Sequence, residues 1–168
     1  MKALELLDKS EVVMKLKTCI PMNDEYVALL GQALYSFTYY EWTIISIIDC
    51  FKKGFIQQHY REKIPFTKRD IEDGFVNINI ANDPKLQNCK HNFDELQEER
   101  NALVHSHPCT SKNGEQVLNY QASTDKKFHD FLWDAGKLKD FINKVDKAVS
   151  ETSQLFDSYR KISEEPQH

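Results

Sequence analysis

The feature that most constrains the fold is the stretch from residue 26 to residue 48, in which Glu41 is the only formally charged side chain. Large apolar side chains recur there every three or four residues, which is the spacing of one helix face. They are Tyr26, Leu30, Leu34, Phe37, Ile44, Ile45 and Ile48. Because this apolar stripe is wide, the sequence predicts a long helix at the centre of a bundle.

The same stretch is long enough to cross a membrane, but its polar side chains argue against a membrane span. A carboxylate in the middle of a spanning helix costs about 2.5 to 3.5 kcal/mol on insertion. Further polar groups within the stretch are Gln32, Ser36, Thr38, Thr43 and Ser46. We therefore expect that this helix does not span a membrane and that the protein does not bind one.

Helix signals recur along the rest of the chain. Helices are predicted over roughly residues 3 to 18, from Asn23-Asp24-Glu25 onward, from Thr67 and Asp70 to about Asn79, from about Lys85 to His105, and over roughly 134 to 160. Between the last two, Asn113-Gly114 precedes a short apolar segment, which indicates a β-hairpin. The predicted fold is an all-α, up-and-down bundle of about five helices with a small β-hairpin after the fourth. We expect one domain over residues 1–162 and a flexible tail over 163–168.

Composition excludes several classes of protein. With 5 Gly and 5 Pro, the chain has too few turn residues for a β-sandwich, and its net charge of -4 excludes a broadly basic surface for nucleic acid. The 4 Cys are scattered without a CxxC pair, and carboxylates interrupt the first apolar residues of the chain. We therefore expect reduced thiols and a cytoplasmic location.

One arginine interrupts the apolar face of the predicted fourth helix. Arg100 falls in line with Phe93, Leu96 and Leu103, and a guanidinium in such a place needs a charged partner or a cleft. Glu41 is equally out of place on the long helix, so the two charges are predicted to meet where the helices pack. A site role and a purely structural ion pair both fit this pattern.

The residues after Arg100 suit phosphate chemistry. Asn101 and His105 follow it, so that an arginine, an amide and an imidazole lie near one helix end. Arginine binds phosphate oxygens with fixed geometry and stabilises negative charge, and histidine transfers protons at neutral pH. The segment is therefore a candidate site for cleavage of a phosphodiester.

The segment Arg100-Asn101-Ala102-Leu103-Val104-His105 resembles the R-x4-6-H signature of the HEPN superfamily, in which a polar residue follows the arginine. Members of that superfamily are small helical bundles that commonly form homodimers. Two motifs then form a composite, metal-independent ribonuclease site. Many members act in toxin or antiviral defence systems.

The resemblance implies roles for individual residues. Arg100 would stabilise the scissile phosphate and His105 would serve as general acid or base, with Asn101 and Glu41 in support. The RNA 2′-hydroxyl would attack the adjacent phosphorus and leave a 2′,3′-cyclic phosphate. The implied partners are RNA, a second copy of the chain, and an antitoxin or another regulatory protein, with no metal and no cofactor.

The sequence departs from one branch of the family. In the branch paired with nucleotidyltransferase antitoxins, a tyrosine follows the histidine by two positions, and here His107 stands there. Modification of a tyrosine at this position is therefore not expected, and His107 is instead a candidate supporting residue. The alternative function is a non-catalytic, dimerising interaction module with the same fold.

Residues 51–69 are basic within an acidic protein. They contain six basic side chains and one acidic side chain, a net charge of +5. Lys52, Lys53, Arg61 and Lys63 are therefore candidate RNA-binding residues, although a solvated helix end and loop would have the same composition.

A zinc site was the remaining alternative. His105, His107 and Cys109, with Cys89 and His91 upstream, are suitable ligand types. A helix from residue 89 to residue 105 would be about 24 Å long, which separates the two groups. A three-ligand site formed by His105, His107 and Cys109 alone is the alternative that this length leaves open, and we predict no metal site.

Overall fold

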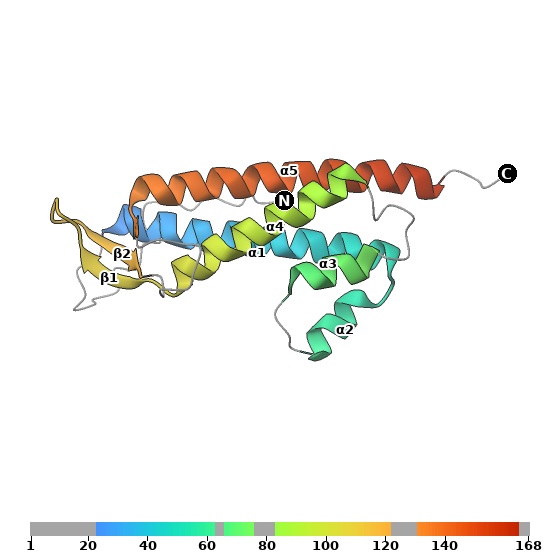
Figure 1. Ribbon diagram of the computed structural model, residues 1–168, viewed down its shortest axis with the longest axis horizontal. Helices are drawn as coiled ribbons and strands as arrows, with labels where there is room; N and C mark the ends of the chain where they lie inside the picture. The colour runs from blue at the N-terminus through green and yellow to red at the C-terminus, as the bar shows by residue number, and fades with distance from the viewer. Residues whose placement is uncertain (1–22, 63–65, 76–82, 122–130, 165–168) are drawn as a thin grey trace, which may run out of the picture.

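The computed structural model describes residues 23–62, 66–75, 83–121 and 131–164. Within these ranges the chain forms five helices and a three-stranded antiparallel sheet, which confirms the predicted mainly helical fold class. In Figure 1, α1 and α5 run in the same direction along the long axis, α4 runs back obliquely across them, and the sheet lies at one end. The helix predicted over residues 3 to 18 lies outside the described residues.

Helix α1 (Asp24–Phe51) is the predicted long helix. The side chain of Asn23 accepts a hydrogen bond from the backbone N–H of Tyr26 at 3.0 Å, so the sequence signal marks a true helix cap. The buried side chains are Ala33, Phe37, Tyr40, Ile44, Ile45, Ile47 and Ile48. No described helix is both long enough and apolar enough to cross a membrane.

Two short helices follow, of which only the second was predicted. Gly54, with φ of 92°, turns the chain into α2 (Phe55–Glu62), and Asp49 accepts hydrogen bonds from the backbone N–H groups of Gly54 and Ile56. Helix α3 (Lys68–Phe75) starts where Thr67 and Asp70 bond to each other, as expected. Its predicted end near Asn79 lies outside the described residues.

Helix α4 (Pro84–Val104) starts and ends within one residue of the prediction. Asp83 caps it by accepting a hydrogen bond from the backbone N–H of Lys85 at 2.8 Å, and His105 is its C-cap. Pro84 takes the first position of the helix, where the missing N–H has no cost. The arginine segment thus lies in the last two turns of a well-defined helix.

The predicted hairpin is present and gains a third strand. Strands β1 (His107–Thr110) and β2 (Gln116–Tyr120) are antiparallel and joined by a turn in which Gly114 has φ of 83°. Strand β3 (Phe131–Trp133), which was not predicted, pairs with β2. The hydroxyl of Tyr26 in α1 donates to the carbonyl of Trp133 at 2.6 Å and accepts from the N–H of Leu118 at 3.0 Å, and so joins the sheet to the bundle.

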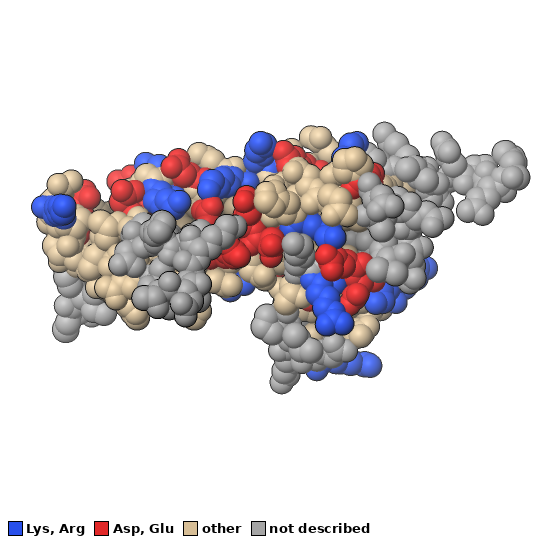
Figure 2. Space-filling view, in the orientation of Figure 1, with Lys and Arg blue, Asp and Glu red and all other residues tan. Residues whose placement is uncertain are grey.

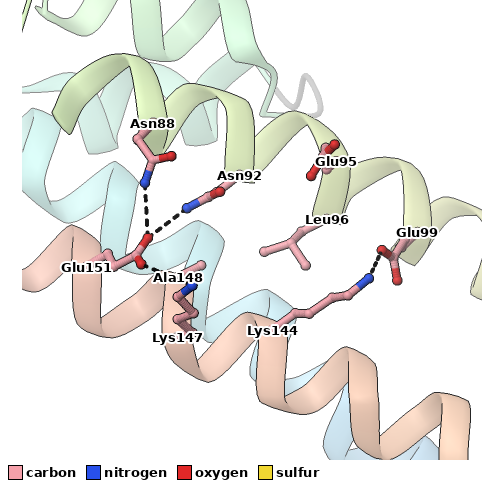
Figure 3. A pocket seen from close by; sticks show the side chains of 9 residues that line it. All are labelled: Asn88, Asn92, Glu95, Leu96, Glu99, Lys144, Lys147, Ala148 and Glu151. Atoms are coloured by element: carbon pink, nitrogen blue, oxygen red, sulfur yellow. Dashed lines mark hydrogen bonds and ion pairs between the residues drawn. The ribbon is translucent and has the colours of Figure 1, made fainter. Parts of the chain in front are cut away.

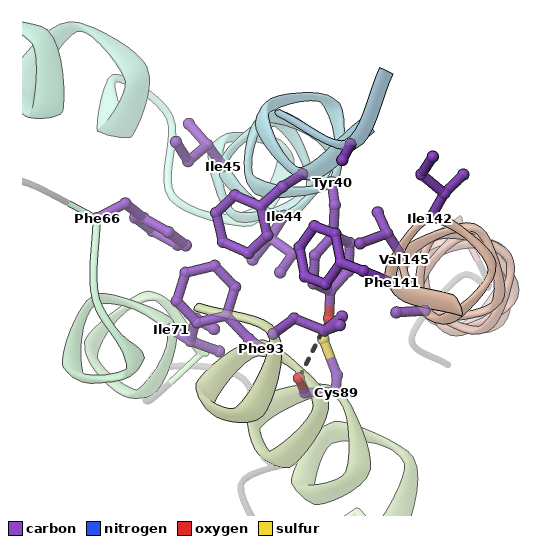
Figure 4. Close-up of a cluster of buried hydrophobic side chains, with 14 of the residues drawn as sticks. Tyr40, Ile44, Ile45, Phe66, Ile71, Cys89, Phe93, Phe141, Ile142 and Val145 are labelled. Atoms are coloured by element: carbon purple, nitrogen blue, oxygen red, sulfur yellow. Dashed lines mark hydrogen bonds between the residues drawn. The ribbon is translucent and has the colours of Figure 1, made fainter. Parts of the chain in front are cut away.

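Helix α5 (Ala135–Glu164) completes the bundle along α1. Aromatic rings dominate the centre of the core (Figure 4), where Phe93 of α4 lies 6.0 Å from Phe37, 6.1 Å from Tyr40 and 5.2 Å from Phe66. Phe141 of α5 stacks on Phe37 at 6.5 Å. The core therefore joins α1, α4 and α5 and also holds the start of α3.

Candidate functional site

Arg100 of α4 faces α1. Its guanidinium carbon lies 5.0 Å from the centre of the Phe37 ring, a cation–π geometry. Its Nε is buried without a hydrogen-bond partner, and no ion pair within the described residues involves its guanidinium. The guanidinium is thus held by packing against Phe37 and has one buried donor, Nε, whose hydrogen-bonding capacity is unused.

Glu41 lies one turn after Phe37 on α1 and is partly buried. Burial raises the pKa of its carboxyl group, whereas the positive charges of Arg100 and then His59 lower it. The two charges that interrupt the apolar faces of their helices are therefore close enough to interact. They do so without a direct ion pair in the described structure.

His105, by contrast, does not lie on the same face of α4 as Arg100. Five positions along a helix correspond to a rotation of about 140°. Arg100 faces the core, whereas Asn101, His105 and His107 are all exposed. The predicted convergence of an arginine and an imidazole on one face is therefore not evident within a single chain.

His59 lies near this pair of charges, although no sequence motif singles it out. It lies on α2, parallel to the ring of Phe55 at 6.2 Å and edge-on to Phe66 at 5.6 Å, and it acts electrostatically on Glu41. Its place beside Glu41 depends on α2 folding against α1, which no local pattern indicated. The one sequence signal is that His59 follows Phe55 by four positions, a spacing that places the two rings on the same face of a helix.

The four candidate RNA-binding residues do not form one described patch. Lys53 and Arg61 are exposed, but Lys52 is partly buried with its ammonium 5.6 Å from the centre of the Phe55 ring. Lys63 lies outside the described residues. On the face seen in Figure 2, acidic side chains gather near the middle and the basic side chains lie in several separate places, so no single basic patch is seen there.

A hollow of about 230 Å³ lies between α4 and α5 (Figure 3). Glu151 accepts hydrogen bonds from Asn88 at 3.1 Å and Asn92 at 3.0 Å, and Lys144 donates to Glu99 at 2.6 Å. Its charged lining residues are Glu95, Glu99, Glu151, Lys144 and Lys147. Because carboxylates outnumber ammonium groups, this hollow does not favour a phosphate.

The ligand types that suggested zinc are not brought together. In the part of the chain that the structure describes, no group of three His, Cys, Asp or Glu side chains could hold a metal ion. Cys89 instead lies in the core, where its sulfur is 3.5 Å from the hydroxyl of Thr152 and burial raises the pKa of the thiol. It acts as a core residue.

Comparison of the chain with known protein families, with curated proteins and with solved structures finds no match.

Proposed function

We propose that this protein is a metal-independent endoribonuclease of the HEPN type that cleaves RNA as a homodimer. The observation that carries this proposal is the state of Arg100: its guanidinium is fixed over Phe37, and its Nε is buried without an acceptor. Leaving such a donor unpaired costs about 1 to 3 kcal/mol, and a phosphate oxygen removes that cost. Arg100 would thus be positioned to stabilise the negative charge that develops on the phosphate oxygens in the transition state.

In the proposed reaction the RNA 2′-oxygen forms a bond to the adjacent phosphorus while the bond to the 5′-oxygen breaks. His105 takes the proton of the 2′-hydroxyl as general base and gives a proton to the leaving 5′-oxygen as general acid. The products are a 2′,3′-cyclic phosphate and a 5′-hydroxyl, and no water is consumed. Asn101 would orient His105, and His107 would support the leaving side.

A site shared between two subunits fits the placement of these residues. Arg100 faces inward and His105 is exposed at the helix end, so one chain does not offer both groups from the same face. A two-fold dimer would place His105 of the second subunit near Arg100 of the first and form two equivalent sites. Lys53 and Arg61 would contact the RNA backbone beyond the site, together with Lys52 and Lys63.

The proposal is tested by incubating the purified protein with mixed RNA in EDTA and analysing the ends of the products. We expect fragments with cyclic phosphate ends, and a loss of about 100-fold or more in Arg100→Ala and His105→Ala. His91→Ala, which removes an exposed histidine of the same helix, is the matched control. Intact RNA, or cleavage that persists in both site variants, contradicts the proposal.

A mixing experiment tests the shared site. Equal amounts of Arg100→Ala and His105→Ala, after subunit exchange, contain heterodimers in which one of two composite sites is intact. About a quarter of the wild-type activity is then expected. No recovery, although exchange is verified, would mean that both groups act within one chain.

The biological role in this proposal is that of a toxin or defence effector in the cytoplasm, held in check by an antitoxin or another regulatory protein. It is supported by the likeness of residues 100–105 to the HEPN motif. Expression of the wild-type chain should then arrest growth, and expression of His105→Ala should not.

A second candidate is a non-catalytic, dimerising interaction module. The observation that favours it is the electrostatic interaction of Arg100 with the partly buried Glu41, together with the exposure of His105 on another side of α4. In that case Arg100→Ala lowers thermal stability and His105→Ala changes neither stability nor RNA integrity. The same variants therefore separate the two functions.

A further inference from the structure

The solvent-exposed face of α1 has no charged side chain over most of its length. From residue 27 to residue 50, about 35 Å of helix, every exposed residue of α1 is uncharged. These residues are Val27, Ala28, Gly31, Gln32, Tyr35, Thr38, Tyr39, Trp42 and Cys50. The exposed residues of α5, by comparison, include Lys139, Asp140, Lys144, Asp146 and Lys147. Because 29% of the chain is charged, an exposed helix face of this length without a charge indicates a contact surface.

Three large aromatic side chains lie on this face. Tyr35 is 73% exposed, Tyr39 is 53% exposed and Trp42 is 39% exposed, and their spacing places them on one side of α1. We call these three residues the aromatic face. Tyrosine and tryptophan bury a large area while they lose few rotatable bonds, and they are enriched among the residues that contribute most to binding.

The hydroxyl groups beside the aromatic face already have partners. Thr38, Thr43 and Ser46 each donate a hydrogen bond to the backbone carbonyl four positions earlier, at 3.0, 2.9 and 2.8 Å. Removal of water from a polar group costs little when that group keeps its hydrogen bond. The face can therefore be covered by another apolar surface without leaving these donors unsatisfied.

A hollow of about 410 Å³ adjoins the aromatic face on the side of α5. Its lining residues are Tyr35, Ser36 and Tyr39 of α1 and Asp146, Val149 and Ser150 of α5. Asp146 is the one charged residue among them. The hollow gives the aromatic face a recess into which a bulky side chain of a partner can enter.

The chemistry of this face fits a second copy of the chain. The exposed residues include no lysine or arginine, so the face does not suit the phosphates of RNA or an anionic lipid surface. In a two-fold contact a surface meets itself, and any charge near the axis meets a like charge. A face without charges avoids that repulsion.

We propose that the aromatic face binds the aromatic face of a second copy, with the two α1 helices antiparallel about a two-fold axis near Thr38 and Tyr39. This arrangement places Trp42 of each copy opposite Tyr35 of the other, beside the hollow. It also places Gly31 of each copy opposite Ser46 of the other, so that small residues meet where the helices continue past the rings. The pattern of large and small side chains is thus the same when read from either end.

This contact is separate from the proposed nuclease site. Tyr35 and Tyr39 each lie two positions from Phe37, a rotation of about 200° around the helix. The aromatic face is therefore on the opposite side of α1 from Phe37 and from Arg100, whose guanidinium lies on that ring. The inference goes beyond the proposed function and does not rest on it.

Sedimentation velocity of the full chain tests the contact. Tyr39→Glu puts a charge where the symmetry brings it close to its own copy, and should give about half the average mass of wild type at the same concentration. Gln57→Glu adds the same charge at an exposed position of α2, and should have the mass of wild type. Because the side chain of Tyr39 is exposed, Tyr39→Glu should keep the helical circular dichroism of wild type.

A disulfide cross-link provides a second measurement that does not need a disruptive variant. Thr38→Cys places one thiol on each side of the proposed axis, and should form a disulfide-linked dimer on mild oxidation. Gln57→Cys and the wild type, which has the exposed Cys50, are the controls and should form far less of it.

The outcomes separate this contact from other uses of the face. Equal masses of wild type and Tyr39→Glu, or cross-linking of Thr38→Cys no greater than that of Gln57→Cys, overturn the inference. So does a wild type that stays monomeric, including one that instead binds phosphatidylcholine vesicles through this face. RNA cleavage by the same variants is measured separately. Tyr39→Glu should cleave as wild type does, and an absence of cleavage in every variant contradicts the nuclease proposal alone.

Discussion

At the scale of single residues, Glu41 makes stability depend on pH in an unusual direction. Burial raises the pKa of its carboxyl group above the unfolded value, so the folded state binds the proton more tightly. The stabilisation that comes from this tighter proton binding is complete below the pKa of Glu41 in the unfolded state. It is lost as the pH rises through the pKa of Glu41 in the folded state. Above the folded pKa, the ionised Glu41 therefore weakens the fold.

The prediction is that Glu41→Gln raises the free energy of unfolding at pH 7 and changes it little at pH 4. Glutamine has nearly the same shape and cannot ionise, so it avoids the cost that appears as the pH rises. Urea unfolding at the two pH values measures the difference, with Glu98→Gln as the control. A gain of equal size at both pH values would contradict the assigned cause.

Arg100 and Glu41 were predictable because each interrupts an apolar line of known period. The contact of Arg100 with Phe37 follows from the same periodicity once α1 and α4 are packed. His59 was not predictable in this way, because its neighbours Glu41 and Phe66 come from other elements. A residue whose role depends on tertiary packing leaves little trace in local sequence.

At the scale of elements, two helical glycines differ in what surrounds them. A Cβ on Gly74 of α3 would lie 2.6 Å from Cγ2 of Ile48, which is itself fully buried, whereas a Cβ on Gly31 of α1 would meet nothing within 4 Å. Alanine at position 74 must push Ile48 aside within a packed core. Alanine at position 31 only restricts the unfolded chain and favours the helix.

We therefore expect Gly74→Ala to lower the free energy of unfolding by about 1 to 3 kcal/mol. We expect Gly31→Ala to raise it by about 0.5 to 1 kcal/mol. Chemical denaturation of both variants measures the two effects in one experiment. Equal effects of the two substitutions would show that α3 does not pack on Ile48 as described.

The elements that sequence reasoning found are those with strong local signals. Asn23, Asp83 and Gly114 mark starts and turns by their own chemistry, and the structure places a cap or turn at each. Helix α2 is only eight residues long and its sequence, FIQQHYRE, is mostly polar, so the apolar periodicity that would predict a separate helix is weak there. Strand β3 has three residues and exists through pairing with β2, which is a non-local cause.

At the scale of the whole molecule, a composite site makes activity depend on assembly. If two chains supply one site, the specific activity should rise with protein concentration until the dimer is complete and then stay constant. Sedimentation velocity over the same concentrations should show the monomer converting to dimer with the same midpoint. Constant specific activity across a range in which the monomer dominates would contradict a shared site.

The packing of α1 on α5 also bears on how the chain is made. Phe37 and Phe51 of α1 contact Phe141 and Phe156 of α5, so the apolar face of an early helix is covered by the last described one. A ribosome that adds about 5 to 20 residues per second needs roughly 6 to 23 seconds to pass from residue 51 to residue 164. During that interval α4 can cover part of the core-facing aromatic side of α1 through Phe93, but the part that α5 covers in the folded protein stays exposed on the nascent chain.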